Sequence, residues 1–291
     1  MRKRNALNSP RLLELKRKKQ KALGLRLLLA LFGLVLLFGV FIYVTRIPRL
    51  NIKDVEIIGN KVASGGGMEE AVRRVLGGYY LWSIPKTNFL FYPKKEIENE
   101  LAGNFKGLES IDINLNANQT LEVVVTERAA TYTWCGKNLP HEGETENCYF
   151  VDSEGFLFSE APYFSGNVYF KLYGDDLTTG GYYQKQFFPN IVLFKKNLED
   201  MGLKPVALYA EDNGDMKTIL AGKQNSSPEV FWKSDADVKK ITENLETALS
   251  TEPLKSDFKN KYAGLEYLDL RFGSKVYYRF SAQGGPASGG Q

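Results

Sequence analysis

The sequence has only one histidine, His141, and two cysteines, Cys135 and Cys148, among its 291 residues. A single histidine cannot by itself make a catalytic triad, and the chain has no second paired-ligand motif of the kind that holds zinc. Gly-x-Ser-x-Gly is absent, and the glycine run at 65–67 is not followed by the Lys-Ser/Thr of a phosphate-binding loop. We therefore expect no enzyme activity, no cofactor and no bound metal. Carboxylates are scattered along the chain, so an acid/base pair that only the fold assembles stays an open alternative.

Long hydrophobic runs are also scarce, with a single one at residues 27–44 that contains no charged or strongly polar side chain. As a helix it would extend about 27 Å, close to the thickness of a bilayer's hydrocarbon core. A cleaved signal peptide and a buried soluble helix are the alternatives. The run is longer than a signal peptide's apolar region and lacks a small-x-small cleavage site, which favours an uncleaved anchor at 27–45.

Charge is distributed unevenly around this run. Residues 1–26 hold ten of the 38 basic residues and one of the 34 acidic ones, which leaves 28 basic against 33 acidic residues in the rest of the chain. By the positive-inside rule, the basic tail at 1–26 stays in the cytoplasm and the chain beyond Thr45 is exported. Because the exported part is acidic overall, we expect it to bind no nucleic acid.

The exported chain begins with a pattern typical of a small mixed domain over residues 50–128. Alternation predicts a strand at 52–60 that ends on Gly59-Asn60, and further strands at 110–116 and 120–126. Between them, apolar residues at helical spacing predict helices that end at Gly77 and at Gly103, the second with Pro93 in its first turn. The predicted order is strand, helix, helix, strand, strand.

Residues 129–280 predict a second domain of short antiparallel strands, rich in aromatic and β-branched residues. Two helices would cover one face of the sheet: one carries an apolar stripe from Phe187 to Met201 with Gly202 as its cap, and the other begins at Ser234. The chain closes with strands at 265–272 and 275–280, followed by a flexible tail at 281–291. The predicted fold class is α+β, with one N-terminal transmembrane helix.

This layout resembles the FtsQ/DivIB family of bacterial cell-division proteins, in which a cytoplasmic tail and one anchor precede a POTRA domain and a β domain. The segment Leu81-Trp82-Ser83-Ile84 between the two helices contributes to the resemblance. The other matching motif residues are Gly59, Asn60, Glu127, Arg128, Asp152, Gly155, Asp269 and Arg271. Taken alone, Glu127-Arg128 is typical of a surface pair at a strand end, and Asp152 with Gly155 of a tight turn.

The resemblance implies a non-enzymatic scaffold in the cell (inner) membrane at the division septum. Such a scaffold links early and late division proteins and helps regulate septal peptidoglycan synthesis, without a small-molecule substrate. Its partners would be FtsB (DivIC in some lineages) and FtsL, and further FtsW/FtsI and FtsK. Two alternatives remain: a POTRA protein of outer-membrane assembly, and a membrane-anchored cell-wall enzyme.

The last predicted strand offers a physical means of binding, since an uncovered edge strand can accept a strand from another protein. In the family this C-terminal edge is where FtsB and FtsL dock. Alternation predicts that one face of the strand fills the core and that Tyr277 lies on the other. By position, the partner-binding residues are Lys275, Val276, Tyr277, Tyr278, Arg279 and Phe280.

The two cysteines would lie in an oxidising compartment and flank a loop of residues 136–147. We predict a disulfide between Cys135 and Cys148, which for a loop of this size is worth about 3 kcal/mol in the chain-entropy model. A metal site formed by both cysteines with His141 is the alternative.

Overall fold

The computed structural model of the chain describes residues 10–140, 146–222 and 227–281. It divides into two compact units. Unit 1 comprises residues 1–105 and 110–126, and unit 2 comprises residues 106–109 and 127–291.

Unit 1 begins with the long helix α1 (Pro10–Thr45), which continues from the basic segment through the apolar run. Between Glu14 and Thr45 this helix is long and apolar enough to cross a membrane. It ends where Pro48 starts the short 3₁₀ helix η2 (Pro48–Leu50), since proline disfavours helical backbone in the residue before it. The Asn51 side chain donates hydrogen bonds to the carbonyl oxygens of Thr45 and Ile47, which closes this helix end.

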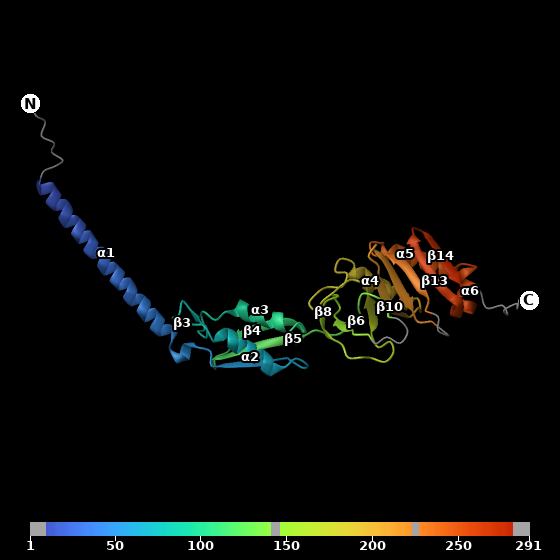
Figure 1. The fold of residues 1–291 in the computed structure, drawn as a ribbon, viewed down its shortest axis with the longest axis horizontal. Coiled ribbons are helices and arrows are strands. Elements are labelled where there is room, and N and C mark those ends of the chain that lie inside the picture. Colours follow the sequence, from blue (N-terminus) through green and yellow to red (C-terminus); the bar gives the residue numbers. More distant parts are fainter. Residues whose placement is uncertain (1–9, 141–145, 223–226, 282–291) are drawn as a thin grey trace, which may run out of the picture. The chain divides into compact units, whose positions relative to one another are not determined.

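The rest of unit 1 is a three-stranded sheet with two helices. The sheet order is β1-β5-β4, with β1 parallel to β5. The predicted order of strands and helices is observed, with one addition, a short hairpin of β2 and β3 between the helices (Figure 1). The elements are β1 (Asp54–Ile58), α2 (Gly65–Leu76), β2 (Tyr79–Tyr80), β3 (Ile84–Pro85), α3 (Lys94–Asn104), β4 (Leu108–Leu115) and β5 (Thr120–Glu127).

The core of unit 1 follows from the predicted spacing. Apolar residues three or four apart on the two helices are buried, and so are alternate residues of β5. They are Met68, Ala71, Val72 and Leu76 of α2, Ile97 and Leu101 of α3, and Leu121, Val123 and Val125 of β5.

Gly59 and Asn60 shape the turn after β1. Gly59 has φ +95°, and a Cβ atom there would lie 2.3 Å from the Val125 carbonyl oxygen, so only glycine fits this position. Asn60 Nδ2 donates to the carbonyl oxygen of Ala63, and Ser64 Oγ then accepts the Gly67 N–H as the cap of α2. These two motif residues therefore have a structural role.

Unit 2 contains one nine-stranded sheet in the order β14-β13-β12-β11-β10-β9-β6-β7-β8. Its strands are β6 (Tyr132–Trp134), β7 (Tyr149–Val151), β8 (Leu157–Glu160), β9 (Phe170–Tyr173), β10 (Pro205–Ala210), β11 (Asp215–Leu220), β12 (Glu229–Lys233), β13 (Leu265–Phe272) and β14 (Lys275–Phe280).

The prediction that this sheet is antiparallel is wrong for three of its strand pairs. β6 and β9, β9 and β10, and β12 and β13 are parallel. Two of these pairs are joined by helical crossovers, which return the chain to the same end of the sheet: α4 (Phe188–Asp200) between β9 and β10, and α5 (Val238–Ser250) with α6 (Leu254–Lys261) between β12 and β13. In the third pair, the chain that leaves β6 first forms β7 and β8 and then returns as β9, which lies beside β6. The fold remains a mixture of helices and a large sheet, but the sheet is mixed.

The helices of unit 2 also differ in part from expectation. The stripe on α4 is buried at Ile191, Phe194 and Leu198 as predicted, but its first buried residue is Phe188, and the predicted end residues Phe187 and Met201 flank the helix and are half-buried. At the end of the helix, the N–H groups of Gly202 and Leu203 bond the carbonyl oxygens of Glu199 and Leu198. α5 begins at Val238 rather than Ser234, because the Asp237 side chain caps it. The third helix, α6, was not predicted, since it buries only Leu254 and shows no apolar stripe.

The larger hydrophobic core of unit 2 lies between the sheet and these helices. At its centre Phe194 of α4 packs against Trp232 of β12, with ring centroids 4.7 Å apart. The Trp232 indole N–H donates to Thr218 Oγ1 at 3.0 Å, so its polar atom is satisfied inside the core. The helices cover the face of the sheet that carries this core. The side chains of β11–β14 that point to the other face are therefore left uncovered, and we call that face the open face.

Candidate docking face at the C-terminal edge

Strand β14 lies at one end of the nine-stranded sheet. In the described part of the chain its only strand neighbour is β13, to which it is joined through Gly273-Ser274 (Figure 1). The two strands are antiparallel, with Asp269 opposite Tyr277 and Leu268 opposite Tyr278. Alternate N–H and C=O groups of such a strand point away from the sheet, where another strand can bond to them.

Side chains of β14 divide between the two faces as predicted. Val276, Tyr278 and Phe280 pack against the hydrophobic core under the helices. Tyr277 lies on the opposite, open face and is 47% exposed. The partner-binding candidates therefore offer two things, an edge of backbone groups and an exposed aromatic ring beside it.

An open groove of about 560 Å³ lies on this face next to β14. Its lining comes from β12, β13 and β14, and it combines aromatic rings with charged groups. We call these residues the docking face: Glu229, Phe231, Tyr267, Asp269, Arg271, Phe272 and Tyr277.

Arg271 is held in place at this groove by two carboxylates. Its Nε and Nη2 donate to the two oxygens of Asp269 at 2.9 and 2.6 Å, and its Nη1 donates to Asp215 at 2.6 Å. The hydrogen bonds that Arg271 donates to Asp269 raise the pKa of Arg271 further above its already high ordinary value, so the guanidinium stays charged. Both carboxylates are engaged by Arg271, which makes neither a freely placed general base.

Aromatic rings surround this fixed charge. The guanidinium carbon of Arg271 lies 5.0 Å from the centroid of the Phe231 ring. Phe272 and Tyr277 meet edge to face with centroids 5.3 Å apart, and Phe272 is 57% exposed. Exposed aromatics around a rigid arginine have the composition of protein–protein hot spots.

Sequence reasoning found some of these residues and missed others. It singled out Asp269, Arg271 and Tyr277, and the fold brings all three to one face. It missed Asp215, because that residue is distant in the chain and only the sheet order places it beside Arg271. The period-2 pattern of β12 could have placed Phe231 on this face, since Val230 and Trp232 alternate into the core.

Three further motif residues, Arg128, Asp152 and Gly155, meet at a different place, the turn before β8. Arg128 pairs through Nη1 with Asp152 Oδ2, and its guanidinium carbon lies 4.3 Å from the Phe156 ring centroid. Asp152 Oδ1 accepts the N–H groups of Glu154 and Phe156 at 2.8 and 3.0 Å, which confirms its predicted role in a turn. Arg128 is thus part of a mostly buried ion pair with Asp152.

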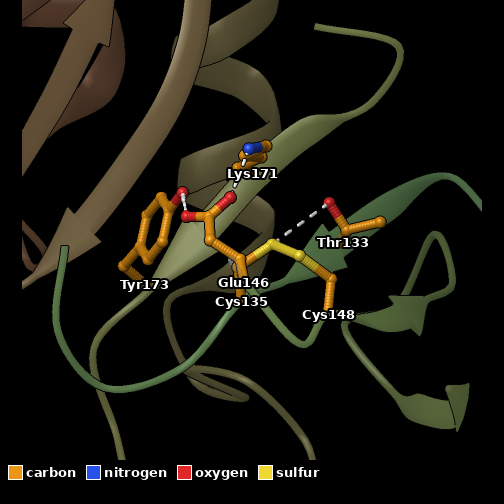
Figure 2. Close-up of a disulfide and its surroundings, with 6 residues drawn as sticks. All are labelled: Thr133, Cys135, Glu146, Cys148, Lys171 and Tyr173. Atoms are coloured by element: carbon orange, nitrogen blue, oxygen red, sulfur yellow. Dashed lines mark hydrogen bonds and ion pairs between the residues drawn. A yellow bond between two sulfur atoms is a disulfide. The ribbon is translucent and has the colours of Figure 1, made fainter. Parts of the chain in front are cut away.

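Cys135 and Cys148 form the predicted disulfide (Figure 2). Beside it, Glu146 accepts hydrogen bonds from Lys171 and from the Tyr173 hydroxyl. Burial, together with the hydrogen bond to Glu146, raises the pKa of Tyr173 well above its ordinary value. Glu146 lies close enough to both sulfur atoms to complete a metal site, but the sulfurs are bonded to each other here. His141 lies outside the described residues.

Comparison with known proteins adds no further evidence: no family model and no curated protein matches the chain. The functional interpretation therefore depends on the sequence patterns and on the geometry of the docking face.

Proposed function

We propose that this chain is a membrane-anchored, non-enzymatic scaffold of bacterial cell division, of the FtsQ/DivIB type. It binds FtsB (or DivIC) and FtsL through its C-terminal edge strand. By holding these proteins at the septum it links early and late division proteins and helps regulate septal peptidoglycan synthesis.

The observation that carries this proposal is the pairing of an edge strand with the docking face. An added strand would bond to the outward backbone groups of β14 and gain affinity from them. Alternate side chains of that strand would reach Tyr277, Phe272 and the charge of Arg271, which would give specificity. Backbone pairing beside aromatic anchors suits a peptide partner better than a small-molecule substrate.

The membrane part of the proposal is supported by α1 and by the charges around it. The apolar run in this helix is preceded by the basic segment, which favours a single pass with the N-terminus in the cytoplasm. The part of unit 1 that follows α1, and all of unit 2, would then lie outside the cytoplasm, in a compartment that permits the Cys135–Cys148 disulfide.

The order of elements in unit 1 supports its assignment as a POTRA domain. Strand, helix, helix, strand, strand is the order that the family resemblance implies, and the motif residues Gly59 and Asn60 form its first turn. In this proposal unit 1 is the contact surface for membrane-embedded partners such as FtsW/FtsI and FtsK.

Depletion of the protein in its own bacterium tests the division role. We expect filamentous or chained cells under the microscope, and normal septation would contradict the proposal. Rescue with full-length variants then tests the edge: Tyr277→Pro should fail, since proline removes a backbone donor and the aromatic ring from β14. Tyr163→Pro, at an exposed loop position between β8 and β9, is the matched control and should restore division.

Co-purification of FtsB and FtsL with the same variants connects this phenotype to binding. The Tyr277→Pro protein should reach the membrane in normal amount but retain neither partner. Equal recovery of both partners by Tyr277→Pro and Tyr163→Pro would contradict strand addition at β14.

A further inference from the structure

Unit 1 exposes apolar side chains at the turn between β2 and β3 and in the loop that follows β3. Leu81 is 82% exposed, Trp82 94% and Leu90 85%. Trp82 differs sharply from Trp134 and Trp232 of unit 2, which are 8% and 0% exposed. A cluster of this kind, uncovered by its own domain, marks a contact with something outside it.

The backbone of the turn holds these side chains outward. Leu81 and Trp82 have φ of +45° and +58°, the left-handed region that favours glycine. The Ser83 N–H bonds the Tyr80 carbonyl oxygen at 3.0 Å and closes the turn. Two bulky apolar residues therefore occupy an unfavourable conformation without gaining burial, so packing within unit 1 does not explain them.

The same region contacts the last turns of α1. Arg46 Nε donates to the Ser83 carbonyl oxygen at 3.1 Å, and Asn88 Nδ2 donates to the Thr45 carbonyl oxygen at 3.0 Å. Phe91 meets Phe41, which lies within the apolar run, edge to face with ring centroids 5.9 Å apart. These contacts place the exposed residues at the level where the apolar run ends.

We infer that Leu81, Trp82 and Leu90 insert into the interfacial layer of the membrane that α1 crosses, on the side where β2 and β3 lie. Tryptophan is the side chain most suited to this layer, because its ring is apolar while its N–H prefers a polar partner. Lipid is the occupant because the cluster is continuous with the membrane-crossing segment through the Phe41–Phe91 contact. Arg46 and Arg49, both exposed beside it, match the phosphate groups above that layer. This inference rests on the proposed membrane anchor.

Tryptophan fluorescence of the full-length protein in lipid vesicles tests the insertion. The vesicles contain phosphatidylcholine and phosphatidylglycerol, with or without bromine atoms on the upper acyl chain, which quench tryptophan on contact. Subtracting the emission of Trp82→Phe from that of the unmodified protein isolates Trp82. We expect loss of most Trp82 emission in brominated vesicles, and protection of that emission from aqueous iodide.

The matched control moves the exposed tryptophan within the same unit. The double variant Trp82→Phe, Val62→Trp carries the exposed tryptophan at position 62 instead. This position is 93% exposed and follows the C-terminal end of β1, the end farther along the chain from α1. The emission of this tryptophan should be quenched by iodide and unaffected by bromine. Trp82 emission that behaves like that of the control would overturn the insertion.

Flotation of the same vesicles separates this inference from the proposed anchor. If the protein floats with the vesicles and Trp82 is quenched by bromine, both stand. If it floats and Trp82 is not quenched, the insertion fails and the anchor stands. If the protein does not float, the anchor fails and the insertion fails with it.

Discussion

The two edges of the nine-stranded sheet are treated in opposite ways. At β8 the chain covers its own edge: the Leu157 N–H bonds the Gly181 carbonyl oxygen at 2.9 Å, and the Gly180 N–H bonds that of Leu157 at 2.8 Å. Phe156 and Tyr182 also pair as an isolated antiparallel β-bridge. At β14, within the described residues, no strand follows on the outer side. Covering one edge from its own chain protects that edge from unspecific pairing, and in the proposed function the open edge of β14 is the one specific binding site.

Side chains reinforce this difference between the edges. At the covered edge, Tyr183 is fully buried and its hydroxyl donates to the Tyr173 carbonyl oxygen at 2.6 Å. Gly155, with φ +88°, lets the turn pass so close to Phe188 that a Cβ atom would lie 2.9 Å from its ring. At the open edge, Tyr277 and Arg279 remain accessible. The covered edge serves stability, and the open edge is available for binding.

The largest predicted effect comes from tyrosine removal at the two edges. Tyr183→Ala should lower the free energy of unfolding of unit 2 by about 3–5 kcal/mol, because it empties a buried ring site and releases the covering segment. Tyr277→Ala should change it by about 0.5 kcal/mol or less. Urea unfolding, followed by the fluorescence of the buried Trp134 and Trp232, measures both. Similar losses for the two variants would contradict the comparison.

Loss of the disulfide should destabilise unit 2 without affecting the open edge. Replacing Cys135 and Cys148 by alanine frees the loop between β6 and β7, at a cost of about 3 kcal/mol for this loop length. The same urea titration gives the change, and FtsB binding by the refolded variant should equal that of the unmodified protein. Binding lost in proportion to stability would show that the two edges are not independent.

Replacing one arginine near each edge should give a smaller difference in stability between the two edges. Arg128→Met leaves Asp152 buried without its cation and should cost about 2 kcal/mol, less than a fully buried pair because the Arg128 side chain is 15% exposed. Arg279→Met removes a pair with Glu266 in which the Arg279 side chain is 66% exposed, and should cost about 0–1 kcal/mol. Thermal unfolding of both variants checks the order, and a larger shift for Arg279→Met would reverse it.

The smallest effect is on the pH dependence of stability. Burial, with a contribution from the Asp175 carboxylate, raises the pKa of Tyr183 well above its ordinary value of 10.0. The stability that neutral Tyr183 contributes is complete below pH 10 and declines as the pH rises further, because the unfolded tyrosine then ionises while the folded one does not. Tyr183→Phe should reduce this decline by about 1.4 kcal/mol per pH unit. Urea midpoints at pH 9 and pH 11 test it, and equal declines would contradict the assignment.

The sequence predicted elements where a periodic pattern decides them. The inner part of the stripe on α4, the alternation in β14 and the turn at Asp152 all depend on neighbouring residues, and all three are observed. Strand direction was not predictable in the same way, because it depends on which distant strand each segment joins. For the same reason the segment at 180–183 gave no signal as a cover for β8: it has no alternation, and its role comes from backbone contacts.

The candidate site also combines features that local periodicity predicts with contacts that only the fold creates. Asp269 and Arg271 are two residues apart on one strand, so alternation alone puts them on one face. Their partner Asp215 comes from β11, and the partner of Arg128 comes from the turn before β8. Such pairs are selected by the fold, and a single sequence contains no periodic signal for them.

Hydrogen exchange of the full-length protein, alone and with FtsB and FtsL, tests the central claim most directly. Backbone amides that join an added strand become protected, whereas amides already bonded inside the chain change little. The account predicts that partner binding slows exchange in β14 and leaves β8 and residues 180–183 unchanged. Protection that arises at β8, or binding without any protection in β14, would contradict it.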